Sequence, residues 1–267
     1  MNPLDPKIIE KLARGGMPIQ EFETWAGSDL EIEILKASGM NLIIDNDRYR
    51  FESAILPLDE AVYCIVDIET NGSKPSQHQI IEIGAIKVQS GSVIDTYETL
   101  VYCTEISEQI QAITGITPDL TRDAPALTKV MREFRVFLGD AIFVGHDAKF
   151  DYSFISSMME RVGLSRLLNR SLCTIDLAER TIQSERYGLA YLNSQLQLYK
   201  DATHHRAFSD AMTTTKLLKR TLKLLPPTIH TVEEVIAFSK EAKRLKKPKT
   251  VVENKQENKE ENIKKES

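Results

Sequence analysis

The chain has 267 residues, of which 42% are hydrophobic, with 12 Gly and 10 Pro, a composition that excludes fibrous and wholly disordered proteins. No apolar run approaches the roughly 18 residues of a membrane span, which excludes a membrane protein. The formal net charge of −5 excludes a whole-chain basic field for holding a polyanion, so we expect any nucleic-acid contact to be local or assisted.

The N-terminus and the cysteines predict a cytoplasmic location. The first seven residues carry an acid and two prolines where a signal peptide would need a basic start and an apolar stretch. Cys64, Cys103 and Cys173 are odd in number and widely spaced, which fits neither a disulfide framework nor a zinc site. We therefore expect reduced cysteines in the core.

Residues 1–58 are predicted to form a small winged-helix-like module of three short helices and a hairpin. Asp5 before Pro6 is a helix start, and Ser28 to Glu31 form a capping box. Asn46-Asp47 is typical of a tight turn between two short strands. The module holds six basic and ten acidic residues, so protein docking or structural packing is favoured over DNA binding, which stays open.

Residues 59–226 alternate strand and helix patterns, which predicts an α/β domain with a mixed sheet flanked by helices. An antiparallel meander is expected over 63–70, 79–88 and 93–101, with a parallel strand at 141–145 and a last one at 171–175. Helices are expected over 125–138, capped by Asp123, and over 151–162 and 207–224.

The C-terminal part is predicted to hold one helix within 227–245, opened by a capping box at Thr231, that packs or docks. Residues 246–267 are polar and are expected to be a disordered tail. Residues 243–267 hold nine basic and five acidic residues, a balance of +4, which leaves −9 for residues 1–242.

Asp67 and Glu69 lie two residues apart in the first strand of the α/β domain, so both side chains point to one face. Burying two like charges in a strand that is otherwise apolar is costly unless a cation neutralises them. Oxygen ligands without a nearby cysteine favour Mg²⁺ or Mn²⁺ over zinc. Taken alone, the pair also fits a solvent-facing edge strand.

Further candidates recur downstream. Asp151 follows the parallel strand at its carboxyl end, where open sheets place their sites. A five-residue step in one helix turns about 500°, so His205 and Asp210 share a site only if His205 lies in the preceding loop. His204 is expected to be a bystander. Ordinary dipole or capping acids are the alternatives for Asp151 and Asp210.

The motifs Asp67 to Gly72, His146 to Asp151 and His205 to Asp210, in this order, resemble the DEDD family of 3'-5' exonucleases, subgroup with histidine. The likeness covers roughly residues 61–225. As a standalone chain, the protein is further similar to the proofreading epsilon subunits of bacterial DNA polymerase III.

The resemblance implies an RNase H-like fold with two divalent metal ions, Mg²⁺ or Mn²⁺, and release of nucleoside 5'-monophosphates. His205 would be the general base that takes a proton from the attacking water, a task that suits an imidazole. The residues after the first motif would contact the terminal nucleotide, namely Thr70, Asn71 and Gly72. The expected metal ligands are Asp67, Glu69, Asp151 and Asp210.

The implied partners are the 3' end of single-stranded or frayed DNA and the DNA polymerase III catalytic subunit, docked through the helix after Thr231 and the tail. Because the acidic body lacks the net charge to hold DNA strongly alone, we expect it to receive frayed 3' ends from a polymerase. Two alternatives stay open, a 3'-5' exoribonuclease in RNA processing and a non-catalytic DNA-binding regulator. The presence of all five catalytic side chains argues against the regulator.

Three further features need interpretation. Asp147 stands where the family has Asn, and its charge beside Asp151 is expected to alter metal affinity or substrate preference. Thr114 replaces a family histidine in an Ile-His-Gly-Ile-Thr turn, which leaves any substrate contact of that histidine without an equivalent. Residues 195–199 resemble a sliding-clamp peptide, but leucines at 189, 192 and 196 favour core packing of a helix.

Overall fold

The computed structural model describes residues 5–248. Most of the predicted tail, residues 249–267, lies outside the described residues. Among residues 5–248, no helix has both the length and the apolar character needed to cross a membrane.

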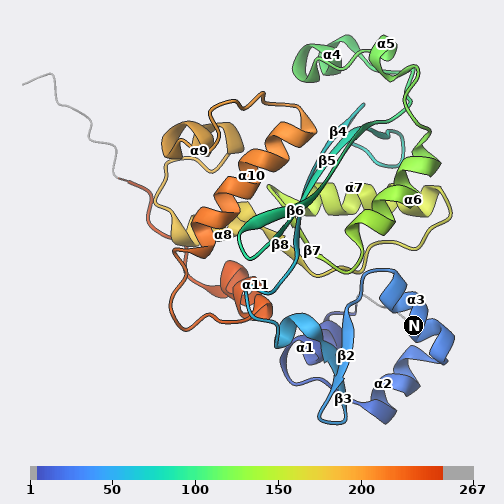
Figure 1. Cartoon of the computed structure of the whole chain (residues 1–267), viewed down its shortest axis with the longest axis vertical. Coiled ribbons are helices and arrows are strands. Elements are labelled where there is room, and N and C mark those ends of the chain that lie inside the picture. The colour runs from blue at the N-terminus through green and yellow to red at the C-terminus, as the bar shows by residue number, and fades with distance from the viewer. Residues whose placement is uncertain (1–4, 249–267) are drawn as a thin grey trace, which may run out of the picture.

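A five-stranded mixed sheet forms the centre of the molecule (Figure 1). Its spatial order is β6-β5-β4-β7-β8, antiparallel from β4 to β6 and parallel from β4 through β7 to β8. This confirms the predicted meander with its parallel addition. The strands are β4 (Tyr63–Thr70), β5 (Ile80–Gln89), β6 (Ser92–Leu100), β7 (Ile142–Gly145) and β8 (Ser171–Cys173).

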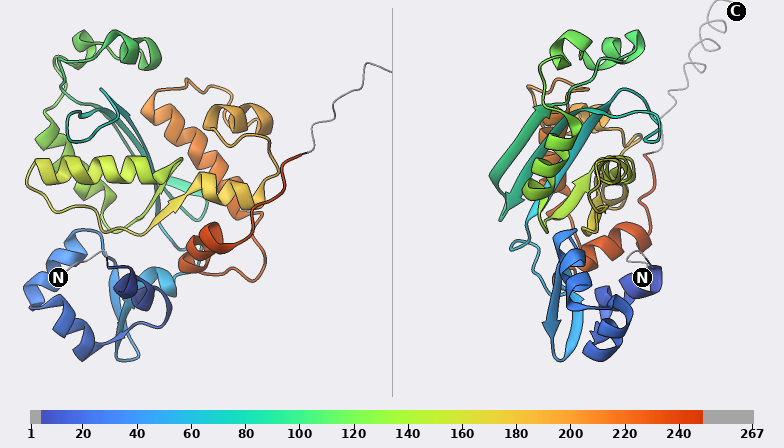
Figure 2. Two further views of the ribbon diagram at one scale, coloured as in Figure 1. Left: turned by 180° about the vertical axis from the view of Figure 1, so that it is seen from behind. Right: turned by 90° about the vertical axis from the view of Figure 1, so that its right-hand side faces the viewer.

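Helices cover both faces of the sheet (Figure 2). On one face, α6 (Leu127–Leu138) and α7 (Ala148–Arg161) bury the side of β4 that carries Cys64, Val66 and Ile68. On the other face, α8 (Thr174–Thr181), α10 (Ala207–Leu222) and α11 (Val232–Glu241) cover the side that carries Tyr63 and Ile65. Because side chains alternate along a strand, Asp67 and Glu69 continue the α10 side.

Several short helices are not predicted by the sequence patterns. The helices α4 (Glu108–Thr114) and α5 (Pro118–Thr121) form a lobe beyond one end of the sheet, and α8 begins where the last strand was expected to continue. Thr114 is buried and donates to the Ile110 carbonyl while it accepts from the Ile116 N–H. These two hydrogen bonds of the Thr114 hydroxyl stabilise the turn, which therefore forms without the family histidine.

Two expected helix starts are wrong by a few residues. The N-cap of α6 is Ala126 rather than Asp123. The helix α7 begins at Ala148, three residues before Asp151, because Asp147 takes the left-handed conformation with φ 72° at its N-cap. Asn and Asp tolerate this conformation better than other non-glycine residues, which accounts for either residue at position 147.

The segment that resembles a clamp peptide is part of the fold. The helix α9 (Leu189–Leu196) buries Leu192 completely, with Leu189, Leu196 and Leu198 packed around it. The backbone N–H of Tyr199 donates to the Asn193 side chain. These contacts confirm the core-packing interpretation of residues 195–199.

The N-terminal module holds the predicted helices and hairpin (Figure 1). Asn46 and Asp47 both have positive φ, as a two-residue hairpin turn requires. A further strand, β1 (Met17–Pro18), pairs with the hairpin, giving the order β1-β3-β2. Its winged-helix character stays a prediction. The other elements are α1 (Pro6–Arg14), α2 (Ile19–Ala26), α3 (Asp29–Ala37), β2 (Leu42–Asp45) and β3 (Arg48–Phe51).

The helix α11 ties the module to the sheet domain. Its residues Val232, Val235 and Ile236 are buried in the core beneath the sheet. Its Glu233 accepts from Arg170 at 2.5 and 2.6 Å and from the Ser53 hydroxyl of the module at 2.7 Å. These contacts confirm that this helix packs on the domain, whereas docking of a partner on it stays a prediction.

Candidate active site

The first part of the site lies on β4. Asp67 pairs with Gly84 of β5, and Glu69 pairs with Glu82. A Cβ at Gly84 would overlap the backbone of Ala207 and Phe208. The absence of a side chain at this position lets the start of α10 lie directly on the sheet, next to the two acids of β4.

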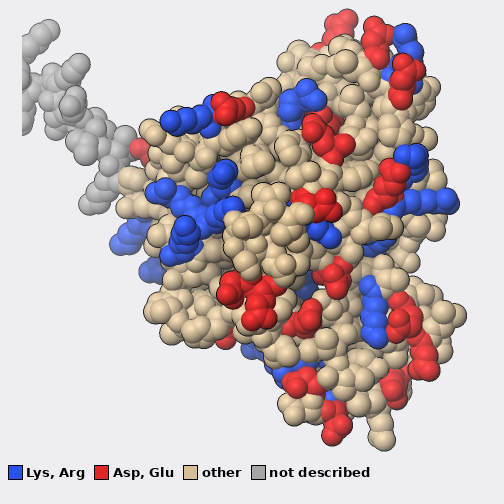
Figure 3. All heavy atoms as spheres, in the orientation of Figure 1, with Lys and Arg blue, Asp and Glu red and all other residues tan. Residues whose placement is uncertain are grey.

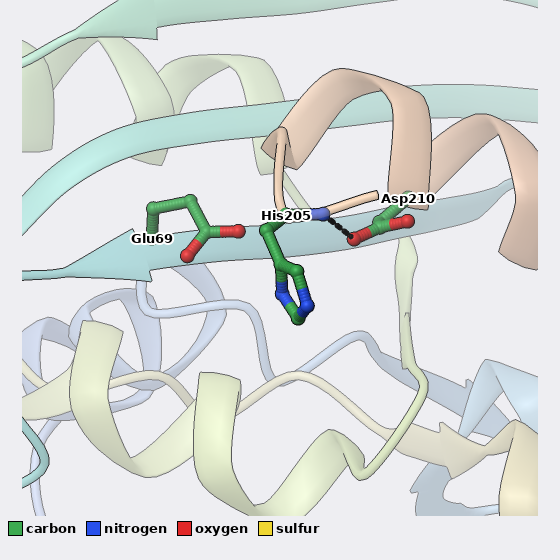
Figure 4. A group of neighbouring side chains, drawn as sticks. All are labelled: Glu69, His205 and Asp210. Carbon is green, nitrogen blue, oxygen red and sulfur yellow. Dashed lines mark hydrogen bonds between the residues drawn. The ribbon is translucent and has the colours of Figure 1, made fainter. Parts of the chain in front are cut away.

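The start of α10 supplies the second part. His205 lies in the loop before the helix with φ 62°, and its backbone N–H donates to Asp210 Oδ2 at 2.9 Å. Ligand atoms of Glu69, His205 and Asp210 all lie within 4.8 Å of one another (Figure 4). The structure thus brings together residues from β4 and from a loop more than 130 positions later in the sequence.

Asp151 supplies the third part from the first turn of α7. Its side chain is 4% exposed. A Cβ at Gly145 would lie 3.1 Å from Asp151 Oδ2, so the glycine that ends β7 leaves room for this carboxylate.

The acids on α7 and α10 raise the pKa values of the acids on β4. Burial raises the pKa of Asp67 well above its ordinary range, and the charges of Asp151, Asp210 and Glu69 raise it further. Burial and the nearby Glu82 raise the pKa of Glu69 to about 8. Burial and the charge of Asp147 raise the pKa of Asp151. Each group therefore feels an excess of negative charge around it.

This donor set fits divalent cations. Converging carboxylate oxygens are the ligands that Mg²⁺ and Mn²⁺ prefer. Positive charge there would offset the repulsion that raises these pKa values. Asp67, Glu69, Asp151 and Asp210 are the residues that would hold the ions.

Next to the acids of β4, Arg206 forms an ion pair with Glu82 of β5. Arg206 donates to both oxygens of Glu82 at 2.7 to 3.3 Å, and the Ala207 N–H donates to the same carboxylate at 2.9 Å. Glu82 is 1% exposed. Sequence analysis missed both residues, because a lone acid in an apolar strand gives no signal of a partner 124 positions away.

The expectation that His204 is a bystander is wrong. Its Nδ1 lies 3.3 Å from Asp210 Oδ1. The angular argument concerned only His205 and Asp210 and did not test the position of His204. The left-handed conformation of His205 turns the backbone and brings both residues to Asp210.

His146, the first residue of the second motif, is also held in place. Its two ring nitrogens lie 2.9 Å from Thr174 Oγ1 and 2.8 Å from the Tyr187 carbonyl oxygen. Burial lowers the pKa of this imidazole. It ties the end of β7 to α8 and to the segment before α9.

The segment after β4 is held by protein contacts. The Asn71 amide donates to the Glu105 carbonyl at 2.8 Å and accepts from the Gln79 N–H at 2.7 Å. Gly72 packs against the ring of His78. Thr70 is half-buried at the end of the strand. Contact of these three residues with a nucleotide stays a prediction.

Comparison with known proteins identifies the family. Residues 64–218 match the RNase T exonuclease family. The chain is 37% identical over 201 residues to a PolC-type DNA polymerase III of Staphylococcus haemolyticus and 31% identical over 196 residues to that of Halalkalibacterium halodurans. These matches cover 73% and 72% of this chain. The chain spans 14% of the length of each relative.

Solved structures share the fold. Exonuclease X in complex with 5' overhanging duplex DNA superposes with a TM-score of 0.53 at 26% identity, over 66% of this chain and 99% of that one. An E. coli ExoI–ssDNA complex gives a TM-score of 0.55 at 18% identity, over 60% and 41% of the two chains. The chain therefore belongs to the RNase T-type exonucleases, the DEDD group of 3'-5' exonucleases, and is related to the exonuclease domain of PolC-type polymerases.

Proposed function

We propose that this protein is the proofreading 3'-5' exonuclease of DNA replication, an epsilon-type subunit of DNA polymerase III, that removes nucleoside 5'-monophosphates from frayed 3' ends. The observation that carries the proposal is that ligand atoms of Glu69, His205 and Asp210 lie within 4.8 Å of one another. Asp67 lies on the same face of β4 as Glu69, and Asp151 is near enough to raise the pKa of Asp67. The PolC relatives support the replicative role.

We assign the four acids as ligands of two divalent ions and His205 as the general base. When bound, such ions activate the attacking water and stabilise the leaving 3'-oxygen. His205 is solvent-exposed and lies beside Glu69 and Asp210, so we assign its imidazole to accept the proton of the attacking water. The bond from its N–H to Asp210 fixes the loop that carries it.

The substrate we propose is the 3' end of single-stranded or frayed DNA. The solved structures of exonuclease X and ExoI are complexes with DNA. Thr70 ends the strand that carries Asp67 and Glu69, and Asn71 and Gly72 follow it, so we assign these three residues to the terminal nucleotide.

The proposed protein partner is the DNA polymerase III catalytic subunit. Because α11 is buried in the core and holds Arg170 through Glu233, deletion from residue 228 would damage the fold. A truncation after Pro248 tests the tail without removing α11. We propose residues 1–58 and 249–267 as docking elements on either side of an exonuclease domain that includes α11.

Digestion of 5'-labelled DNA and RNA oligonucleotides of matched sequence, with Mg²⁺ or Mn²⁺, tests the activity. A ladder shortening from the 3' end of DNA is expected from the wild type, and none from Asp67→Ala. The matched control is Asp95→Ala, which removes an exposed acid on β6. Preference for RNA would replace proofreading by RNA processing, and DNA binding without cleavage would favour a regulator.

A further inference from the structure

The second half of α10 and its C-cap carry four cations that we call the α10 basic stripe, namely Lys216, Lys219, Arg220 and the C-cap Lys223. These positions follow i, i+3, i+4 and i+7, which places all four cations on one side of the helix. Lys219 is half-buried and the other three are exposed. Figure 3 shows Lys and Arg gathered over this part of α10.

The stripe is not explained by the fold. Within residues 5–248, none of its cations lies at ion-pair distance from a carboxylate. Lys216 and Arg220, like Lys219 and Lys223, are like charges four residues apart, an arrangement that destabilises a helix. The helix dipole favours cations in the last turn only, which leaves Lys216 unexplained. A bound anion would relieve this repulsion.

A groove of about 300 Å³ runs beside the stripe. It is lined by the four cations and by Leu196, Gln197 and Leu198 at the end of α9. From this groove the chain leads through exposed Lys200 to His205. Along α10, the stripe begins six residues after Asp210, about 9 Å along the axis. Because six residues turn the helix by about 600°, Lys216 also lies about 120° around α10 from Asp210. The loop from Leu198 to His205 is therefore the segment that joins the groove to the site.

We propose that the α10 basic stripe binds the sugar-phosphate backbone of the substrate strand, upstream of the 3' end held at the site. This inference rests on the proposed function. Residues 1–242 carry −9 overall, so the stripe is a local basic field on a body that otherwise repels phosphate. From Lys216 to Lys223 it extends about 10 Å, roughly the rise of three nucleotides in a B-form strand.

The test uses a stripe variant, with Lys216→Gln, Lys219→Gln, Arg220→Gln and Lys223→Gln. Its control is Lys7→Gln, Lys36→Gln, Lys129→Gln and Arg132→Gln, an equal charge loss at exposed positions elsewhere. Fluorescence anisotropy with a 20-nucleotide single strand in EDTA gives Kd at several salt concentrations. The stripe variant is expected to bind roughly 10- to 100-fold more weakly, with a log–log salt slope smaller by up to about 3.

Cleavage of a dinucleotide, which is too short to reach Lys216 from the site, is expected to be unchanged in both variants. Equal Kd and equal salt slope in the two variants would overturn the proposal. It would also fail if the stripe variant bound DNA normally but lost binding to polyglutamate, which would assign the stripe to an acidic protein. Because anisotropy requires no cleavage, absence of exonuclease activity would count against the proposed function and not against the stripe.

Discussion

Arg206 neutralises Glu82, the buried acid that faces Glu69 across the β4–β5 pair. The same carboxylate accepts the Ala207 N–H at the start of α10. Through these bonds, Glu82 holds the backbone between His205 and α10, the helix that carries Asp210. A β5 acid that is not among the proposed metal ligands thus fixes the position of two proposed catalytic residues relative to β4.

Breaking this ion pair is expected to destabilise the protein. Arg206→Met leaves Glu82 without its cation in a buried position, which lowers the free energy of unfolding by about 2 to 4 kcal/mol. Urea denaturation measures the change. Arg122→Met is the control, because Arg122 pairs with Asp119 on the surface and such pairs contribute at most about 1 kcal/mol. Equal effects of the two substitutions would show that the Arg206–Glu82 pair is not an anchor.

The close approach at Gly84 predicts a loss of activity. Gly84→Ala forces the start of α10 away from β5 and moves His205 and Asp210 relative to Asp67. A displacement of about 1 Å can cost on the order of 100-fold in rate. Steady-state kinetics on single-stranded DNA is expected to show this loss mainly in kcat.

Gly188→Ala is the matched control, since a Cβ there meets no atom within 4 Å and the backbone φ is −66°. It is expected to leave kcat within twofold. Full activity of Gly84→Ala would mean that the helix start tolerates displacement.

The sequence predicted the sheet better than the helices around it. β4 runs from Tyr63 to Thr70 as expected, because a β-rich run that is interrupted only by Asp67 and Glu69 ends before Asn71-Gly72. Helices of four to eight residues, such as α5 and α8, are too short to show a full periodic pattern. The five catalytic candidates were found because each lies in a local motif. Glu82 and Arg206 were not found, because only tertiary structure brings them together.

The raised pKa values predict how the stability of the metal-free protein depends on pH. Folding raises the pKa of Glu69 from 4.5 to about 8. Between these pH values the folded protein therefore keeps a proton on Glu69 that the unfolded chain has lost. Asp67 and Asp151 shift in the same direction. The free energy of unfolding therefore falls as pH rises through this window.

Thermal unfolding in EDTA is expected to show a Tm at pH 8 roughly 5 °C or more below that at pH 5. Mn²⁺ is expected to raise Tm more at pH 8, where the acids are ionised, than at pH 5. Glu69→Gln removes one of these groups and is expected to weaken both dependences. A metal-free Tm that rises from pH 5 to pH 8 would contradict the shared burial of these carboxylates.

The two adjacent histidines predict unequal losses of activity. His205→Ala removes the proposed general base and is expected to lower kcat roughly 10²- to 10⁴-fold with little change in KM, the range typical of such proton transfer. His204→Ala removes only a contact of 3.3 Å to Asp210 and is expected to lower kcat less than about 10-fold. Both are measured on one DNA substrate at saturating Mg²⁺, with circular dichroism to confirm folding. A larger loss in His204→Ala than in His205→Ala would assign the proton transfer to His204.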